Sequence, residues 1–294
     1  MTTAQITASQ VKQLRDATQA GMMDAKKALV ETNGDFDAAV TLLREKGIAK
    51  AGKLGAREVT EGRVGIATNQ HAGALVEIGC NTDFVARNDD FGRFVDKIAG
   101  HVLQHKTRSV EELLTQEWAD GGTVEDARAE AASSTGENIN ITRIAYLDAN
   151  LTTGAEQHGV LGTYIHGTGI GVIVDVAGPD TDEVRTFATD VAMHTAAAAP
   201  QYLTRDEVPQ DAIDAERDIY VKQVEDKPEA IRGKIADGKI NKWFGEIALV
   251  EQPWIFAKDR VGKDLTIEQY AAEVAEKVGQ PVSVRAYARF AIKG

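Results

Sequence analysis

ALVEIGCNTDFVARN, residues 74–88, joins a run of strand-forming residues to a polar segment that carries one large aromatic side chain. The apolar run up to Cys80 predicts a buried strand. From Phe91 to Val102, apolar residues then recur at helical spacing, which predicts a helix. The order of strand, short polar segment and helix indicates a mixed fold in which the polar segment lies at the end of a strand.

Phe84 stands in this polar segment, between Asp83 and Val85. A phenylalanine that follows a strand end can fold back into its own core, or it can stand outside the core and meet a partner. The residues alone leave both alternatives open. Asp83 likewise has two interpretations, because an aspartate beside a strand end often caps the helix that follows.

Further strand patterns lie on both sides of this stretch. Residues 63–68, RVGIAT, precede it across the turn NQHAG and predict a hairpin. Apolar runs with helical stretches between them suggest that the same kind of unit occurs twice, so we expect an α+β fold with antiparallel sheets. The remaining predicted strands are residues 139–148, 160–167, 169–178, 251–256 and 282–292.

The N-terminal residues 1–48 predict a compact three-helix unit. Met22 begins the apolar stripe of the second helix, and of the neighbouring pair Met22 and Met23 we expect one in the core and one on the surface. Phe36 begins the apolar stripe of the third helix, which Gly47 is expected to end.

The composition indicates four more regions. Residues 49–62 are rich in Gly, Ala and Lys and predict a linker. Residues 63–140 and 141–294 form the two predicted halves of the core. Within the second half, residues 205–246 are charged and helix-favouring and are interrupted at Pro228, which predicts an inserted, protruding helical hairpin.

Composition also limits the partners and the location. The 294 residues carry 45 acidic and 33 basic side chains, a net charge of −12, which disfavours direct contact with nucleic acid. No apolar run is long enough to span a bilayer, and no leader-like pattern precedes Thr2, so we expect no membrane contact and a cytoplasmic location. A single cysteine agrees with a reducing compartment.

Motifs for several enzyme classes are incomplete. GKL, GKI and GKD lack the hydroxyl residue of a phosphate-binding loop, so we expect no nucleotide to bind in this way. His101 and His105 are one helical turn apart, but no third ligand is indicated, and two exposed helix residues are the simpler interpretation. Cys80 has no activating base and is expected to be a buried, inert thiol. A thiol enzyme and a protein-binding adaptor remain as alternatives.

Four stretches resemble the bacterial elongation factor Ts family. They are residues 14–29, LRDATQAGMMDAKKAL, residues 77–87, EIGCNTDFVAR, residues 136–140, GENIN, and residues 164–172, YIHGTGIGV. Their order and internal spacing are far more specific than a lone glycine pattern. The resemblance covers nearly the whole chain.

The resemblance implies a guanine-nucleotide exchange factor that acts on elongation factor Tu without catalytic residues, cofactor or metal. It implies that the TDF segment is a wedge near the nucleotide and magnesium of the partner, and that a bundle similar to ubiquitin-associated domains docks on the nucleotide domain. The second half of the core would meet a distal domain. The implied contacts are Thr82, Asp83, Phe84 and Val85 in the wedge, Met22, Met23 and Lys26 in the bundle, and Gly136, His166 and Gly167 in the core.

The sequence departs from the family pattern in places. Ala25 replaces a cysteine or valine, and Thr135 stands where a larger apolar contact residue can occur. The chain ends at Gly294, after the last predicted strand, so no contact of a C-terminal helix is carried over. Dimerisation through the hairpin or the core stays open.

Overall fold

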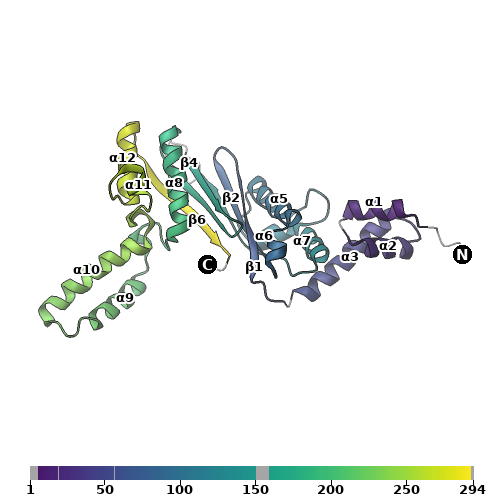
Figure 1. Ribbon diagram of the computed structural model, residues 1–294, viewed down its shortest axis with the longest axis horizontal. Coiled ribbons are helices and arrows are strands. Elements are labelled where there is room, and N and C mark those ends of the chain that lie inside the picture. The colour runs from purple at the N-terminus through teal and green to yellow at the C-terminus, as the bar shows by residue number, and fades with distance from the viewer. Residues whose placement is uncertain (1–5, 19, 56, 150–158, 293–294) are drawn as a thin grey trace.

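The computed structural model describes residues 6–18, 20–55, 57–149 and 159–292. Figure 1 shows a three-helix bundle at one end of an elongated molecule, a core of strands and helices in the middle, and a helical hairpin that projects from the far end. This confirms the predicted α+β fold with N-terminal helices and two antiparallel sheets. The division into domains at the predicted residue boundaries stays a prediction.

The bundle consists of α1 (Ala8–Thr18), α2 (Met22–Glu31) and α3 (Phe36–Leu54). Small residues of α2 allow the three helices to approach closely around a core that is largely aliphatic. The buried residues of this core are Val11, Leu14, Ala25, Ala28, Leu29 and Ala39.

Two expectations for the bundle are wrong. Met22 and Met23 are both exposed, as is Phe36, because the small core is already filled by residues further along each helix. Helix α3 also does not end at Gly47 but runs on into the predicted linker. Gly47 is buried against Ser133 of α7 (Val124–Thr135), so packing outweighs the poor helix propensity of glycine there.

The first half of the core contains β1 (Glu61–Thr68), β2 (Ala72–Cys80) and β3 (Asn140–Asp148), paired antiparallel in the order β1-β2-β3. Every residue of β2 is buried, in agreement with its continuous apolar sequence. Between β2 and β3 the chain forms α4 (Asp83–Ala86), α5 (Asp89–His105), α6 (Val110–Thr115) and α7.

The second half repeats this plan with β4 (Gly159–His166), β5 (Ile170–Ala177) and β6 (Ser283–Ala291) in the order β4-β5-β6. Helix α8 (Asp182–Ala198) covers the sheet, and α11 (Ala257–Val261) and α12 (Ile267–Val278) complete its core. Residues 251–256, predicted as a strand, begin with the last residue of the short 3-10 turn η2 (Leu249–Glu251) and form an isolated bridge between Pro253 and Thr266 instead of a strand. Pro253 lacks the N–H that a paired strand needs.

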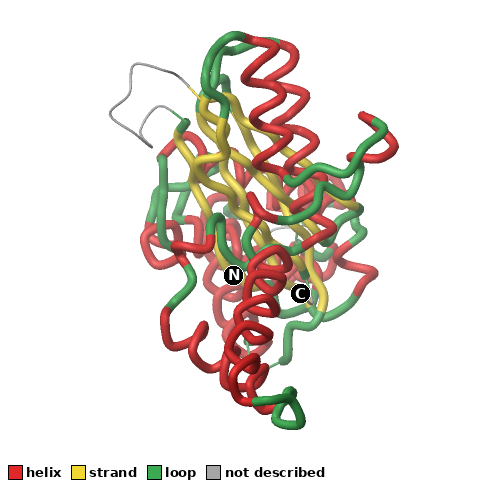
Figure 2. The backbone as a smooth tube through the Cα atoms, turned by 90° about the vertical axis from the view of Figure 1, so that its left-hand side faces the viewer, coloured by secondary structure: helices red, strands yellow, loops and turns green. Residues whose placement is uncertain are grey.

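The two sheets pack face to face, and helices cover their outer faces (Figure 2). Val64, Leu75, Ile173 and Phe290 form the apolar layer between the sheets. The amide of Val64 also donates to the carbonyl of Thr168 at 2.8 Å, which joins β1 to the turn between β4 and β5. The resulting order is helix, sheet, sheet, helix.

The duplication extends to single side chains. In the first half, Glu77 of β2 pairs with Arg143 of β3 at 2.7 Å, beside a β-bulge. In the second half, Asp175 of β5 pairs with Arg285 of β6 at 2.6 Å, again beside a bulge. The same device therefore occurs at the matching place in each sheet, although the two sequences show little likeness.

The hairpin consists of α9 (Gln210–Lys222) and α10 (Glu229–Ile247), with Pro228 directly before α10 as predicted for a helix start. A further 3-10 turn, η1 (Arg205–Glu207), leads into it. No residue of α9 is buried, and the hairpin is anchored at its base by Val208, Phe244 and Ile247.

Among the helices of the described residues, none is both long and apolar enough to cross a membrane.

Candidate functional site: the projecting segment after β2

The segment after β2 begins with a capped turn of helix. Thr82 has an extended backbone, and its hydroxyl accepts from the amide of Val85 at 3.4 Å, which makes Thr82 the N-cap of α4. The thiol of Cys80 donates to the carbonyl of Thr82 at 3.2 Å. The side chain of Asn88 caps α5 by accepting from the amides of Asp90 and Phe91. Two capped helices, α4 and α5, thus follow one another directly after β2.

Phe84 points away from the core. Its side chain is 83% exposed, whereas Val85 packs against the core of the first half and Ala86 is buried. Helical geometry turns consecutive residues of this single turn in different directions, so the inward positions of Val85 and Ala86 leave Phe84 on the outside. The alternative in which the ring folds back into its own domain is therefore wrong.

Asp83 lies beside Phe84 in the first turn of α4. Its carboxylate is 3.6 Å from the guanidinium of Arg87, a half-exposed pair whose net stabilisation is small. Because Thr82 caps α4 and Asn88 caps α5, the alternative that Asp83 is the helix cap is wrong. The carboxylate is left at the surface, next to the exposed ring.

Glu137 is a contact of this segment that reasoning from the sequence missed. Its carboxylate accepts from the amide of Asn81 at 2.9 Å, from the amide of Thr82 at 3.0 Å and from the hydroxyl of Thr82 at 2.5 Å. Glu137 lies in the GENIN stretch, but a contact across more than 50 residues leaves no local signal in one sequence. Gly136, a predicted contact, directly precedes this residue in the chain.

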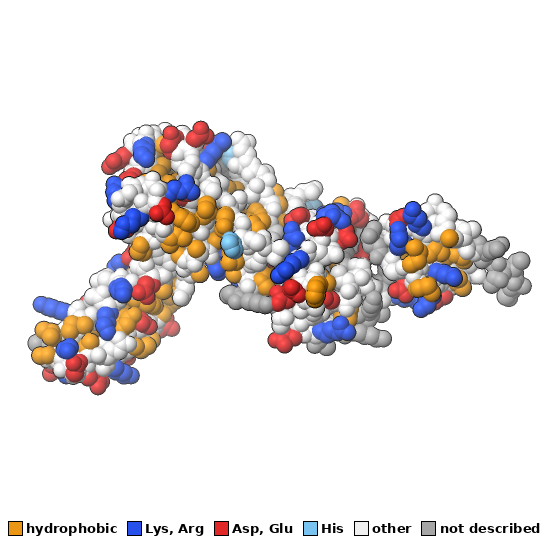
Figure 3. All heavy atoms as spheres, viewed as in Figure 1, with side chains coloured by type: hydrophobic (Ala, Val, Ile, Leu, Met, Phe, Trp, Pro, Cys, Tyr) orange, Lys and Arg blue, Asp and Glu red, His pale blue; other side chains and the backbone are white. Residues whose placement is uncertain are grey.

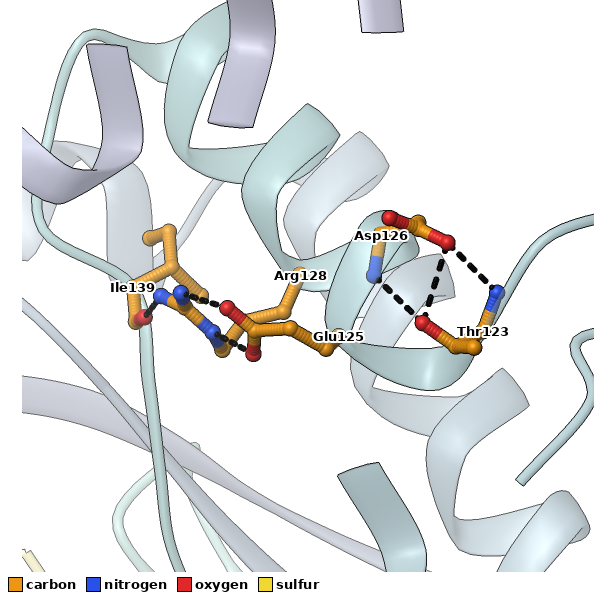
Figure 4. Close-up of polar contacts among 5 residues, drawn as sticks. All are labelled: Thr123, Glu125, Asp126, Arg128 and Ile139. Atoms are coloured by element: carbon orange, nitrogen blue, oxygen red, sulfur yellow. Dashed lines mark hydrogen bonds and ion pairs between the residues drawn. The ribbon is translucent and has the colours of Figure 1, made fainter. Parts of the chain in front are cut away.

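Helix α7 holds the GENIN stretch in place (Figure 4). A capping box between Thr123 and Asp126 starts the helix, and Gly136 ends it with a left-handed φ of 73°. The guanidinium of Arg128 is held by Glu125 and donates to the carbonyl of Ile139 at 2.6 Å. The hydrogen bond to Glu125 also raises the pKa of Arg128, so this guanidinium is permanently charged.

A second exposed apolar area lies on the bundle. Met22 is 46% exposed and Met23 61%, and the predicted contact Lys26 is exposed on the same helix. Val30 of α2 and Phe36 of α3 are also exposed on the bundle. Figure 3 shows exposed hydrophobic side chains on the bundle, on the core and on the hairpin.

The remaining predicted contacts lie where β4 turns into β5. His166 is exposed at the end of β4, and its Nδ1 is 3.1 Å from the hydroxyl of Tyr164. Gly167 follows with a positive φ of 58°, a conformation that glycine adopts at little cost. The predicted site residues therefore lie on three separate parts of the molecule.

Cys80 and His101, which were candidate reactive groups in the sequence, are both buried. Burial raises the pKa of the Cys80 thiol to about 12, and nearby Glu137 adds to this shift, so the thiol stays protonated. His101 is buried rather than exposed as expected, because its Nε2 meets Gln116 at 2.9 Å and its ring stacks on His105. Among the residues that the structure describes, no group of His, Cys, Asp and Glu is arranged to hold a metal ion.

Comparisons with known proteins identify the family of the chain. Residues 81–293 match the family described as Elongation factor TS. An elongation factor Ts of Trichlorobacter lovleyi is 42% identical over 299 residues, which cover 98% of this chain and 92% of that relative. An elongation factor Ts of Halothermothrix orenii is 43% identical over 266 residues, which cover 88% and 86%. One of Clostridium botulinum is 40% identical over 291 residues, which cover 97% and 92%. The chain therefore belongs to the elongation factor Ts family.

Proposed function

We propose that Asp83 and Phe84 wedge into elongation factor Tu beside its nucleotide and magnesium site and thereby promote the release of GDP. Membership of the elongation factor Ts family implies nucleotide exchange on elongation factor Tu during translation elongation, without covalent chemistry. The observation that carries the finer proposal is the exposure of Phe84 on a helical turn whose next two side chains, Val85 and Ala86, pack inward. The predicted cytoplasmic location, where translation takes place, is part of the proposal.

The wedge has two physical components. Burial of an exposed phenylalanine in a partner contributes about 1.5–3 kcal/mol. A carboxylate beside the ring would add repulsion towards the phosphates of bound GDP, because like charges at short range disfavour each other. Asp83 is suited to this role, since it is already at the surface and only weakly paired with Arg87.

The wedge needs further contacts. A ten-thousandfold loss of nucleotide affinity would require about 5.5 kcal/mol of differential binding, more than one ring provides. We propose that Met22, Met23 and Lys26 of the bundle supply part of the remainder, and that Gly136, His166 and Gly167 supply contacts in the core. By linkage, the complex with nucleotide-free partner is then the tight one.

Release of a fluorescent GDP analogue from purified elongation factor Tu tests the proposal. We expect the intact chain to accelerate release, and Phe84→Ala to lower this acceleration by about 10- to 100-fold, which corresponds to the lost burial of the ring. Asp83→Asn should lower it by a smaller factor. Circular dichroism spectra of both variants should match that of the unaltered chain, because neither side chain packs into the core.

Ile219→Ala is the matched control, since Ile219 is 47% exposed on α9 of the hairpin. We expect this variant to exchange nucleotide as well as the unaltered chain. If the unaltered chain bound elongation factor Tu without changing the release rate, the chain would be an adaptor rather than an exchange factor. If Phe84→Ala exchanged at the normal rate, the wedge would be refuted even though exchange itself occurred.

A further inference from the structure

The start of the projecting segment lies against one carboxylate. Oε2 of Glu137 accepts from the amides of Asn81 and Thr82, and Oε1 accepts from the hydroxyl of Thr82. Hydrogen bonds to a charged acceptor are stronger than those between neutral groups. Three such contacts converge on two residues that directly precede α4.

Other contacts fix the position of Glu137 itself. The amide of Asn138 donates to Oδ1 of Asn81 at 2.8 Å, and the Asn138 side-chain amide donates to the carbonyl of Arg57 at 2.9 Å. Arg128 holds the next residue, Ile139, through its carbonyl oxygen, as Figure 4 shows. The two residues that follow Glu137 are therefore attached to α7 and to the chain before β1.

Helix α4 needs this support. It contains only four residues, and an isolated helix of that length is unstable in water because nucleation costs more than one turn of hydrogen bonds returns. Its one side-chain cap is the hydroxyl of Thr82, which the carboxylate of Glu137 also contacts. The direction of Phe84 thus depends on a turn that has few hydrogen bonds of its own.

We propose that Glu137 is a positioning residue for nucleotide exchange: its carboxylate holds Asn81 and Thr82 so that α4 is formed, and Phe84 points outward, before the partner arrives. The inference rests on the proposed function of Phe84. A ring fixed in its bound direction loses less conformational freedom on binding, so removing the support weakens its action. Glu137 acts through Phe84 and does not itself need to touch elongation factor Tu.

A double-mutant cycle with Phe84 tests the inference. Glu137→Ala should lower the second-order rate constant for GDP release by about tenfold in the otherwise unaltered chain. In the Phe84→Ala background the same change should have little further effect, because no ring remains to be positioned. The fall in melting temperature caused by Glu137→Ala should be the same in both backgrounds.

Glu137→Gln is the conservative variant. Its amide oxygen can still accept from the two backbone amides, and its NH2 group can donate to the Thr82 hydroxyl, so we expect most of the exchange activity to return. Asp126→Ala is the matched control for damage to α7, because it removes the capping box but no contact of the wedge segment. This variant should melt at a lower temperature and exchange nucleotide normally. Should Glu137→Ala fail to fold, Glu137→Asp tests the same contacts by shortening the side chain.

The outcomes separate the two proposals. Normal exchange by Phe84→Ala would overturn the wedge. A defective Phe84→Ala with a fully active Glu137→Ala would overturn only the positioning role. The positioning role would also be lost if Glu137→Ala reduced exchange equally in both backgrounds, or if Asp126→Ala reduced it as much as Glu137→Ala.

Discussion

Gly162 lies on β4 directly beneath α8, and its replacement by alanine should force the two apart. A Cβ atom at this position would be 2.0 Å from the carbonyl oxygen of Ala188 and 2.2 Å from its carbonyl carbon. Ordinary contacts of such atoms begin near 3.4 Å, so the helix would have to move by roughly 1.4 Å, the difference between 3.4 and 2.0 Å. The opposing atoms belong to the helix backbone and cannot rotate away.

The expected magnitude follows from the packing of α8. Overpacking of a core usually costs about 1–3 kcal/mol, and a gap of 0.5–1 Å already forfeits a quarter to a half of each van der Waals contact. Helix α8 buries Val184, Phe187 and Val191 against this sheet, so we expect a cost at the upper end of that range. Alanine also restricts the unfolded chain more than glycine does, which stabilises the folded state by about 0.5–1 kcal/mol. The net loss should be about 2–2.5 kcal/mol.

Gly100→Ala is the control, because it is the same chemical change in the long helix α5 of the other half. Apart from its chain neighbours and the backbone of its own helix, no atom lies within 4 Å of a Cβ built there. We expect this variant to be more stable than the unaltered chain by about 1 kcal/mol, through better helix propensity alone. The two variants should thus change stability in opposite directions.

Urea unfolding followed by tryptophan fluorescence and by circular dichroism measures both changes. Trp254 is buried in the core that α8 covers, so its fluorescence reports on the affected half. With an m-value of about 3 kcal/mol/M, the midpoint of Gly162→Ala should fall by about 0.7–0.8 M. A midpoint at or above that of the unaltered chain, with an unchanged m-value, would refute the argument that α8 rests on the bare backbone of β4.

Two further predictions concern titratable groups. Cys80 should resist maleimide at pH 8 in the folded chain and react once urea exposes it, and Cys80→Ser should keep exchange activity; rapid labelling of the folded protein would contradict the pKa of about 12. Burial lowers the pKa of His194, whose Nε2 meets Gln252 at 2.9 Å and whose Nδ1 accepts from the amide of Ile255. The contribution of neutral, buried His194 to the free energy of unfolding should be complete above the unfolded pKa of about 6.5. This contribution should fall by up to about 1.4 kcal/mol per pH unit as the pH drops towards the lower pKa of the folded state. Denaturant melts at several pH values should show this slope in the unaltered chain and a smaller one in His194→Gln; equal slopes would contradict it.

Strong local patterns were sufficient to predict much of the fold. The apolar run before Cys80 is strand β2, and the helical spacing from Phe91 to Val102 lies within α5. The break at Pro228 correctly separated the two helices of the hairpin. These features depend on residues close together in the chain, which is why one sequence contains them.

Features that depend on tertiary packing could not be predicted. The apolar stripe of α2 does not reveal that Ala25, Ala28 and Leu29 already fill the core and leave Met22 at the surface. Gly47 is a helix breaker by propensity, but α7 packs against it and the helix continues. Both errors arise from the way the helices pack against one another, which the local pattern of residues does not contain.

The sequence predicted some residues of the candidate site but not their arrangement. The resemblance to elongation factor Ts pointed to Thr82, Asp83 and Phe84, but the residues alone left the direction of the ring open. No local pattern in the sequence marks Glu137, because its contacts are with Asn81 and Thr82, more than 50 residues earlier in the chain.

Helix α3 is a single piece from Phe36 to Leu54, and it belongs to the bundle at one end and packs on α7 at the other. Because one continuous helix connects the bundle to the core, its length and helical twist determine the position of the exposed methionines relative to Phe84. Inserting one residue between the two ends would turn the bundle by about 100° and shift it by only about 1.5 Å. Orientation of the two surfaces is thus far more sensitive to an insertion than their separation is.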